Sequence, residues 1–274
     1  MIATEQFGEI TQIQMGRDLG GRVLYWVAAY LADDLLIDTG CRHTAEELLA
    51  YLECKTVNHV YLTHYHEDHI GGCALLNKYL NLNIQAHASS ISLINSIDHL
   101  YPYQELVWGY PEQAEIQALN RNEIKTKNFT FQIMETPGHS PDHTVLIEPN
   151  RGWCFSGDLF ISERIKVLRP EEDIGKIMQS MQKLIEFETD PSSKLILFTS
   201  IGKVVPEGRK ALKNCLNYLE NLGKKAAELH SKEGLSEEQI VARIFGAESA
   251  LAELTDEQFA SKNLIGSLLK NRQV

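Results

Sequence analysis

The chain has 274 residues, with 26 Lys and Arg against 37 Asp and Glu, and a formal net charge of −11. Hydrophobic residues make up 43% and charged residues 23%, a globular balance that excludes a disordered, collagen-like or disulfide-stapled chain. The five cysteines form no C-x-x-C pair, which argues against a disulfide framework and a zinc knuckle. The longest apolar run, Tyr25 to Ala32, is too short to cross a bilayer, and the first residues lack a signal-peptide pattern. We therefore expect a cytoplasmic protein with no membrane partner.

Negative charge is concentrated in residues 1–205, which carry 16 basic and 27 acidic side chains, whereas residues 206–274 carry ten of each. A nucleic-acid-binding protein needs Lys and Arg to neutralise phosphates, so we expect a small-molecule substrate and no nucleic-acid partner. Strand-like segments end near Pro206. We therefore expect a domain over residues 1–205 and a helical C-terminal extension over residues 206–274. The sequence does not determine the oligomeric state, and a homo-oligomer is one of the options.

In the first part, strand-like and helix-like segments alternate. Apolar alternation and β-branched or aromatic runs predict strands over residues 6–15, 23–32, 35–37, 59–62, 84–87, 129–134, 144–147, 153–155 and 194–198. Capping boxes and helical periodicity predict helices over residues 44–52, 73–80, 90–97, 113–119 and 173–187. The first of these helices is expected to begin at Thr44, whose spacing to Glu47 is that of a capping box. The strands gather in two groups, which favours packed sheets with helices outside over a regular doubly wound fold.

The C-terminal part is expected to form about three helices. Its first helix carries an apolar stripe at helical spacing and should end at Gly234. The residues of the stripe are Leu212, Cys215, Leu216, Leu219 and Leu222. Ser236 with Gln239, and Thr255 with Gln258, are two further capping-box patterns. Because an amphipathic helix needs a partner surface to be stable, we expect this part to dock on the first.

A histidine-rich segment, residues 63–69, reads Thr-His-Tyr-His-Glu-Asp-His and follows a predicted strand. It holds four potential metal ligands, His64, His66, Asp68 and His69, in a pattern with a low false-positive risk. His64 and His66 are two residues apart on chain that leaves a strand, so their side chains can point the same way. Asp68 and His69 come where the next helix begins and face a neighbouring point. One loop can thus serve two adjacent cations, and imidazole with carboxylate suits zinc or iron better than calcium.

Two further segments also follow predicted strands. In Thr136-Pro-Gly-His139 the Pro-Gly turn can present His139, and Ser156-Gly157-Asp158 ends a strand with an acid. Each segment is weak on its own, since His and Asp are common in turns. They become candidate ligands because they share with the histidine-rich segment a place directly after a strand.

Together with Asp38 in Leu36-Ile-Asp38-Thr-Gly40, these segments resemble the metallo-β-lactamase-fold hydrolase superfamily, in particular its glyoxalase II-like branch. The matching pieces fall in the family's order and cover about residues 6–205. The resemblance implies an α+β fold, a four-layer αββα sandwich with a metal site at one edge of both sheets. The C-terminal helices are similar to the helical appendage of some members. Asp38 is similar to the family's supporting aspartate, which orients a ligand.

By this resemblance, His64, His66 and His139 would bind a first metal, and Asp158 would bridge it to a second. The resemblance implies zinc, one or two ions per chain, with iron and manganese as alternatives.

Asp68 and His69 would bind the second metal, but the family's last ligand is missing. The family has a His in a Gly-His-Gly-like turn after its final strand, and Ile201 stands at that place. We therefore expect the second metal to bind more weakly than the first. The hydroxyls of Thr199 and Ser200, which are weak zinc ligands, are the candidates to complete its shell.

The combination predicts a metal-dependent hydrolase. A bound metal lowers the pKa of coordinated water to about 7 and polarises a carbonyl, and Asp68 or Asp158 would orient the attacking hydroxide. By resemblance, the substrate would be a small thioester, ester or lactone.

Three other functions stay open at this stage. The first is a phosphodiesterase or nuclease of the same fold, which the acidic charge disfavours. The second is a di-iron oxygen- or redox-active protein, although the chain shows no flavin-binding domain. The third is a non-catalytic binding protein with a decayed site, which only Ile201 favours.

Some other residues have two interpretations each. His143 could contact the substrate or support the site, or it could be a capped strand residue. Arg164 or Lys166 could meet an acidic substrate or simply be solvated. The aromatic residues between Tyr101 and Tyr110 could line a pocket, although a core position is the more common role for such residues.

Overall fold

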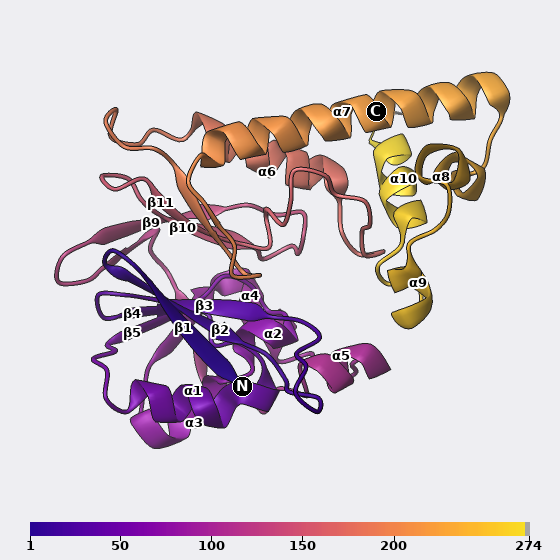
Figure 1. Ribbon diagram of the computed structural model, residues 1–274. Helices are drawn as coiled ribbons and strands as arrows, with labels where there is room; N and C mark the ends of the chain where they lie inside the picture. The colour runs from indigo at the N-terminus through magenta and orange to yellow at the C-terminus, as the bar shows by residue number, and fades with distance from the viewer. Residues whose placement is uncertain (272–274) are drawn as a thin grey trace.

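The first of two sheets in the computed structural model, which describes residues 1–271, has seven strands in the order β1-β2-β3-β4-β5-β6-β7 (Figure 1). Its strands are β1 (Ile2–Phe7), β2 (Ile10–Met15), β3 (Val27–Ala32), β4 (Leu35–Ile37), β5 (His59–Leu62), β6 (Ile84–His87) and β7 (Ile116–Leu119). The pairs from β1 to β4 are antiparallel, and those from β4 to β7 are parallel. Because β4 and β5 are parallel, Asp38 and the histidine-rich segment leave the sheet at the same edge.

The second sheet has six strands in the order β13-β12-β11-β10-β9-β8. Its strands are β8 (Glu123–Lys125), β9 (Thr130–Glu135), β10 (Thr144–Glu148), β11 (Trp153–Gly157), β12 (Ile196–Thr199) and β13 (Val204–Val205). β10 pairs antiparallel with β9 and β11, while β11 and β12 are parallel. The end of β9, the start of β10 and the ends of β11 and β12 therefore meet at one edge, which brings His139, Asp158 and Ser200 together.

Helices cover both outer faces of the stacked sheets and complete four layers (Figure 1). On the first sheet lie η1 (Arg42–Thr44), α1 (Ala45–Leu52), α2 (Glu67–Ile70), α3 (Cys73–Leu80), α4 (Ala88–Ile94) and α5 (Pro102–Val107). On the second sheet lie α6 (Ile174–Glu186) and α7 (Gly208–Glu233), followed by α8 (Glu237–Phe245), α9 (Ala250–Leu254) and α10 (Ser261–Lys270). The αββα sandwich expected from the sequence is confirmed. No helix within residues 1–271 is both long and apolar enough to cross a bilayer.

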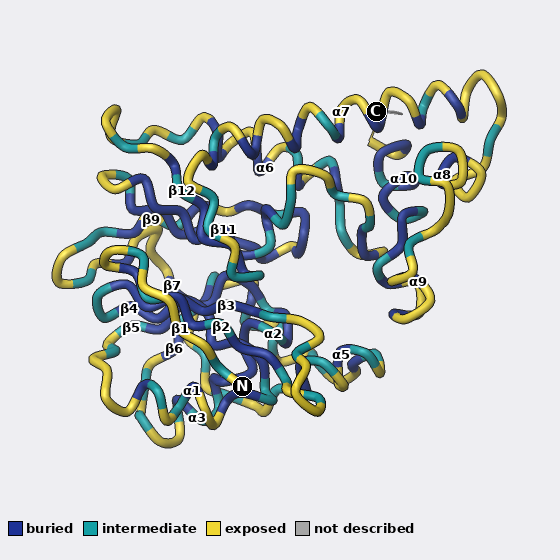
Figure 2. The backbone as a smooth tube through the Cα atoms, viewed as in Figure 1, coloured by how far each residue is buried: buried dark blue, intermediate teal, exposed yellow. Residues whose placement is uncertain are grey.

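The unbroken apolar run of β3 reflects its position, because both faces of the strand are covered. Val27, Ala29 and Leu31 face the helices on the outer side of the first sheet. Ala28 and Tyr30 face the second sheet and contribute to the core between the two sheets. All residues of β3 are buried (Figure 2). A strand covered on both faces has no reason to alternate polar and apolar residues.

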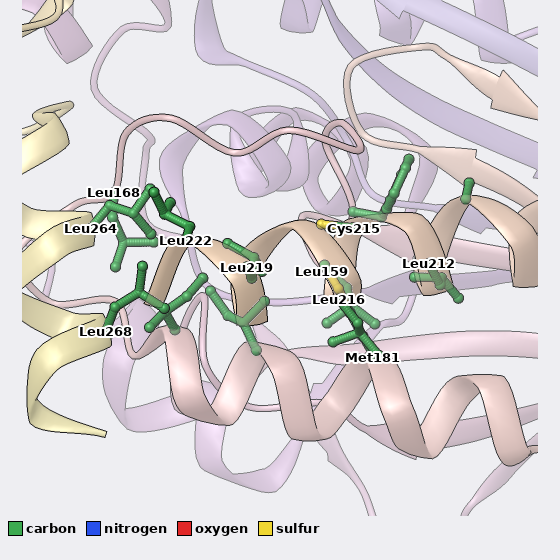
Figure 3. Packing of buried hydrophobic residues seen from close by; sticks show 14 of the residues in the cluster. Leu159, Leu168, Met181, Leu212, Cys215, Leu216, Leu219, Leu222, Leu264 and Leu268 are labelled. Carbon is green, nitrogen blue, oxygen red and sulfur yellow. The ribbon is translucent and has the colours of Figure 1, made fainter. Parts of the chain in front are cut away.

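The C-terminal helices share a hydrophobic core with the first part of the chain. The stripe predicted on α7 is buried in one cluster with residues of α6, α10 and the second sheet. In Figure 3, Leu216 of α7 lies beside Met181 of α6, and Leu222 lies beside Leu264 of α10. The boundary at residue 205 stays a prediction, and residues 272–274 of the predicted extension lie outside the described residues.

Several element predictions were wrong in instructive ways. The predicted helix 113–119 is instead the strand β7, since Ile116 pairs with Ile84 of β6 and long-range pairing outweighs local propensity. The helix α5 was not predicted. Residues 206–271 form four helices rather than three.

The three predicted capping boxes fared differently. Ser236 and Gln239 form theirs at the start of α8. Thr44 precedes α1, but its hydroxyl donates to the Cys41 carbonyl instead of capping the helix. Thr255 ends α9 and caps no helix start. Of the three predicted capping boxes, the one of Ser236 and Gln239 forms its side-chain hydrogen bonds at a helix start.

Replacing Leu219 with alanine should destabilise the whole protein. The side chain is fully buried in the cluster shared by α6, α7 and α10, so its loss leaves a cavity. We expect a cost of about 2–5 kcal/mol and a Tm lower by roughly 4–15 °C, measured by thermal and urea unfolding. Leu254→Ala is the matched control, since that leucine is 72% exposed and its truncation should leave Tm within about 1 °C. Equal effects of the two substitutions would contradict the shared core.

Candidate metal centre

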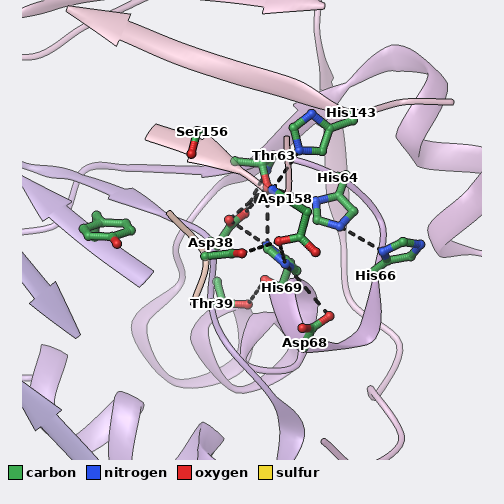
Figure 4. Close-up of polar contacts among 12 residues, drawn as sticks. Asp38, Thr39, Thr63, His64, His66, Asp68, His69, His143, Ser156 and Asp158 are labelled. Atoms are coloured by element: carbon green, nitrogen blue, oxygen red, sulfur yellow. Dashed lines mark hydrogen bonds and ion pairs between the residues drawn. The ribbon is translucent and has the colours of Figure 1, made fainter. Parts of the chain in front are cut away.

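Three loops bring three histidines and an aspartate together at the common edge of the two sheets. Figure 4 shows His64, His66 and Asp158 of this group beside Asp68 and His69. His64 and His66 follow β5, His139 lies between β9 and β10, and Asp158 follows β11. One ligand atom from each of the four side chains lies within 4.8 Å of all the others. His66 Nδ1 is 3.0 Å from His64 Nε2 and 2.9 Å from His139 Nε2. His139 Nε2 is in turn 3.1 Å from Asp158 Oδ2.

Asp68 and His69 lie on the other side of the Asp158 carboxylate. His69 Nε2 is 3.5 Å from Asp158 Oδ1 and 3.9 Å from Asp68 Oδ1. The two oxygens of Asp158 therefore face two different groups of ligands, His139 on one side and His69 on the other. This is the arrangement that a bridging carboxylate needs, and the second metal itself stays a prediction.

The buried nitrogens of the site fit a divalent metal. Nε2 of His66 and Nε2 of His69 are buried and have no hydrogen-bond partner among residues 1–271. Leaving such an atom unsatisfied is costly. A metal beside Asp158 would satisfy His69 Nε2, whereas His66 faces the other ligands through Nδ1. Burial, reinforced by the neighbouring imidazoles, lowers the pKa of His64 well below its ordinary value. Burial also lowers the pKa of His66, so both rings are neutral, as metal ligation requires.

The two carboxylates of the site differ in charge in the metal-free chain. Burial raises the pKa of Asp68 to about 7. Burial works in the same direction on Asp158, but His139, His69 and Ser200 outweigh it and hold the pKa of Asp158 well below its usual range. Asp158 is therefore the permanently anionic group to which a cation would bind.

Asp38 orients His69. Its Oδ2 accepts a hydrogen bond from His69 Nδ1 at 2.8 Å, and its Oδ1 accepts one from the Thr63 backbone N–H at 2.8 Å. Burial opposes a charged ring, but Asp38 and Asp68 outweigh it and raise the pKa of His69 well above its ordinary value. A metal at Nε2 would replace that proton while Asp38 keeps the ring aimed at Asp158. The role expected for Asp38 matches these contacts.

His143 supports the Asp158 loop rather than facing the cavity. Its Nε2 accepts the backbone N–H of Asp158 at 3.0 Å, so Nδ1 carries the proton and donates to Thr136 Oγ1 at 2.8 Å. Burial lowers the pKa of His143 to about 3, which keeps this neutral tautomer. The supporting role is thus the one that the structure favours for this residue.

Two residues, Glu172 and Ser200, support the site. The sequence did not predict Glu172, and it offered Ser200 only as a candidate metal ligand. Glu172 Oε1 accepts the Nδ1 proton of His139 at 2.5 Å, although it lies 33 residues further along the chain. Ser200 donates its hydroxyl proton to Asp158 Oδ1. Ser200 was a candidate from its place after the last long strand, whereas no local pattern marks Glu172. Only the packing of the segment before α6 against the His139 loop brings Glu172 there.

The ligands open onto a cavity of about 400 Å³. His66, Asp68, His139 and Asp158 line its floor, and Trp108 contributes to its wall. Arg164 and Lys166 also line the cavity, so the structure brings both cations to the site. Within the cavity, polar ligands therefore face a wall that is largely apolar.

The four-layer sandwich, with His and Asp side chains clustered at the edge of its sheets, indicates the class of metal-dependent hydrolases. The metallo-beta-lactamase superfamily pattern matches residues 23–199, and the chain belongs to that superfamily. Over 180 residues the chain is 27% identical to "Beta-lactamase-like protein 2 homolog" of Drosophila melanogaster, covering 62% of this chain and 58% of that protein.

Two further similarities concern a named thioesterase and a solved structure. The chain is 26% identical over 158 residues to "Atrochrysone carboxyl ACP thioesterase" of Claviceps purpurea, covering 56% of this chain and 43% of that protein. It thus spans about half the length of the curated relatives it matches. The crystal structure of a beta-lactamase domain protein from Burkholderia ambifaria superposes with a TM-score of 0.66 at 15% identity, covering 100% of this chain and 85% of that one. That match extends over the C-terminal helices and concerns the fold alone.

Proposed function

We propose that the protein hydrolyses small thioesters, with esters and lactones as related substrates, in a zinc-dependent reaction. The observation that carries the proposal is the cluster of His64, His66, His139 and Asp158, of which the last three line a partly apolar cavity. Imidazole and carboxylate donors together suit zinc, with iron or manganese as alternatives. A relative named as an acyl carrier protein thioesterase adds support for the substrate class.

A bound divalent metal would lower the pKa of a coordinated water to about 7 and polarise the substrate carbonyl. The chain's own residues would position the reactants. Asp158 is held by Ser200 and faces His139, so its orientation is fixed. Asp68 lines the cavity, and within residues 1–271 its side chain has no comparably close partner, since its ion-pair contact with His69 measures 3.9 Å. We assign to Asp68 the role of accepting a hydrogen bond from the attacking water and to Asp158 the role of bridging the metals.

Two cationic side chains at the cavity favour a substrate whose leaving group is an anionic thiol carrier. Arg164 and Lys166 line the cavity and are exposed to solvent. Two cations beside an otherwise acidic protein would attract the phosphates or carboxylates of a carrier thiol. The five cysteines are all free thiols, in keeping with a reducing compartment such as the cytoplasm. The proposal therefore includes a small-molecule substrate and neither a nucleic-acid nor a membrane partner.

The test is a panel of three substrate types offered to the same zinc-loaded protein. We expect hydrolysis of an acyl thioester to exceed that of a phosphodiester, with an aliphatic lactone between them. Chelator should abolish the thioester activity, and added zinc should restore it. Turnover of the phosphodiester alone, or thioester activity that survives complete metal removal, would contradict the proposal.

A further inference from the structure

The C-terminal helices contribute directly to the cavity that holds the metal ligands. Ser249, Leu251 and Phe259 line it together with His66 and Asp158. These three residues lie beyond residues 23–199, the region that matches the superfamily. One wall of the cavity is thus built by a part of the chain outside the catalytic fold.

This wall is fastened to the segment that follows Asp158. Leu168 and Ala260 form an isolated antiparallel bridge, with Leu168 N–H donating to the Ala260 carbonyl at 3.1 Å. Asn263 Nδ2 also donates to the Leu168 carbonyl at 3.0 Å. Both bonds lie on the C-terminal side of Phe259, and the Phe259 N–H donates to Thr255 Oγ1 at 3.0 Å. The backbone that carries the ring is thus held next to the cavity.

Aromatic and cationic contacts fix the Phe259 ring further. It meets Tyr103 of α5 edge-to-face, with ring centroids 6.0 Å apart. The guanidinium of Arg169 lies 5.7 Å from the Phe259 centroid, and Arg169 Nε pairs with Glu171 Oε1 at 2.8 Å. In Figure 1, α9 lies on the same side of the molecule as α5, in agreement with the contact between Tyr103 and Phe259. The buried cation of the wall is therefore already paired, and the wall offers mainly apolar surface.

The apolar surface faces an apolar counterpart. Leu159, Ile165 and Leu168 line the same cavity as Leu251 and Phe259. Leu251 is 48% exposed although it lines a cavity, so a ligand that covered it would remove apolar area from water. The cavity volume of about 400 Å³ falls within the range of sites that bind small molecules. An unbranched hydrocarbon chain suits such a space better than a charged group.

We propose that Leu251 and Phe259 form the subsite for an apolar acyl chain, so that the preferred substrates are thioesters of medium-length aliphatic acids. This inference rests on the proposed thioesterase function and specifies its substrate. The thioester carbonyl lies at the metal ligands, the chain runs along the wall made by α9 and Phe259, and the thiol carrier extends past Arg164 and Lys166. Hydrolysis adds water across the acyl–sulfur bond, releasing the free acid and the thiol.

The experiment measures kcat/KM of the zinc-loaded protein for straight-chain acyl thioesters from two to twelve carbons. Burial of a methylene corresponds to about a fourfold gain, so we expect about fourfold per added carbon until the chain fills the cavity. Leu251→Trp should shift the optimum to shorter chains and lower kcat/KM for the longest ones at least tenfold. Leu254→Trp is the matched control on the same helix, and it should leave the profile unchanged because Leu254 is not among the described residues that line the cavity.

A second measurement separates this subsite from the reaction. Calorimetric binding of decanoate and acetate to the zinc-loaded protein should show decanoate binding more tightly, and Leu251→Trp should remove the difference. Chain-length-dependent binding without thioester hydrolysis would overturn the proposed reaction and leave the apolar subsite standing. Thioester hydrolysis without a chain-length preference, or equal effects of the two tryptophan substitutions, would overturn the subsite and leave the reaction standing.

Discussion

Replacing His66 with alanine is expected to remove the first metal and abolish hydrolysis while the protein stays folded. His66 Nδ1 lies 3.0 Å from His64 Nε2 and 2.9 Å from His139 Nε2, so its ring stands at the centre of the ligand group. The loss of a direct ligand should exceed the 10–100-fold cost of losing a supporting residue, and we expect at least about 1,000-fold weaker zinc binding. The ligand lies on a loop at the sheet edge, so the core between the sheets is unaffected.

The measurements are zinc content after gel filtration, thioester hydrolysis and circular dichroism. His99→Ala is the matched control, because His99 is an exposed histidine that does not line the metal cavity within the described residues. The control should retain full zinc and full activity. Retention of both by the His66 variant would show that His66 is not a ligand.

The second metal is expected to bind more weakly than the first and to be strengthened by an imidazole placed at residue 200. The resemblance put Ile201 at the place of the missing ligand, but the Ser200 hydroxyl is the group that reaches Asp158. Neither Ser200 nor Ile201 is among the described residues that line the cavity, so the contact with Asp158 is the observation that favours residue 200. Neighbouring side chains at a strand end point in different directions, so Ser200→His should supply the ligand and Ile201→His should not.

Calorimetric zinc titration decides between the two positions. The natural chain should show one tight site and one at least tenfold weaker. Ser200→His should tighten the weaker site by about 100-fold, and Ile201→His should leave it unchanged. The reverse result would return the missing ligand to residue 201, and two equally tight sites in the natural chain would show that its second site is already complete.

Local sequence patterns predicted most of the fold because most elements bury a regular face. The helix α6 was predicted within one residue at each end, since its apolar side chains recur at helical spacing and Asp173 caps its start. The strand β7 could not be predicted locally. Only its pairing with β6 makes residues 116–119 a strand, and the partner residues lie about thirty positions earlier in the chain.

The candidate ligands were predictable because each follows a strand and is a residue type that binds metals. Supporting residues lack such a signal. Glu172 reaches His139 because Asp173 N–H donates to the Gly138 carbonyl at 2.8 Å and thereby brings two distant loops together. The wall formed by Leu251 and Phe259 could not be predicted either. The sequence predicted that the C-terminal helices dock on residues 1–205, but it did not indicate which of those residues they contact.

The bridge between Leu168 and Ala260 sets an order of events during synthesis of the protein. Asp158 leaves the ribosome 102 residues before Ala260, which at 5–20 residues per second corresponds to roughly 5–20 seconds. During that interval the four clustered ligands are already synthesised, whereas Phe259, which lines the finished cavity, is not. Metal can therefore meet its ligands before the residue that completes this wall of the cavity has been made.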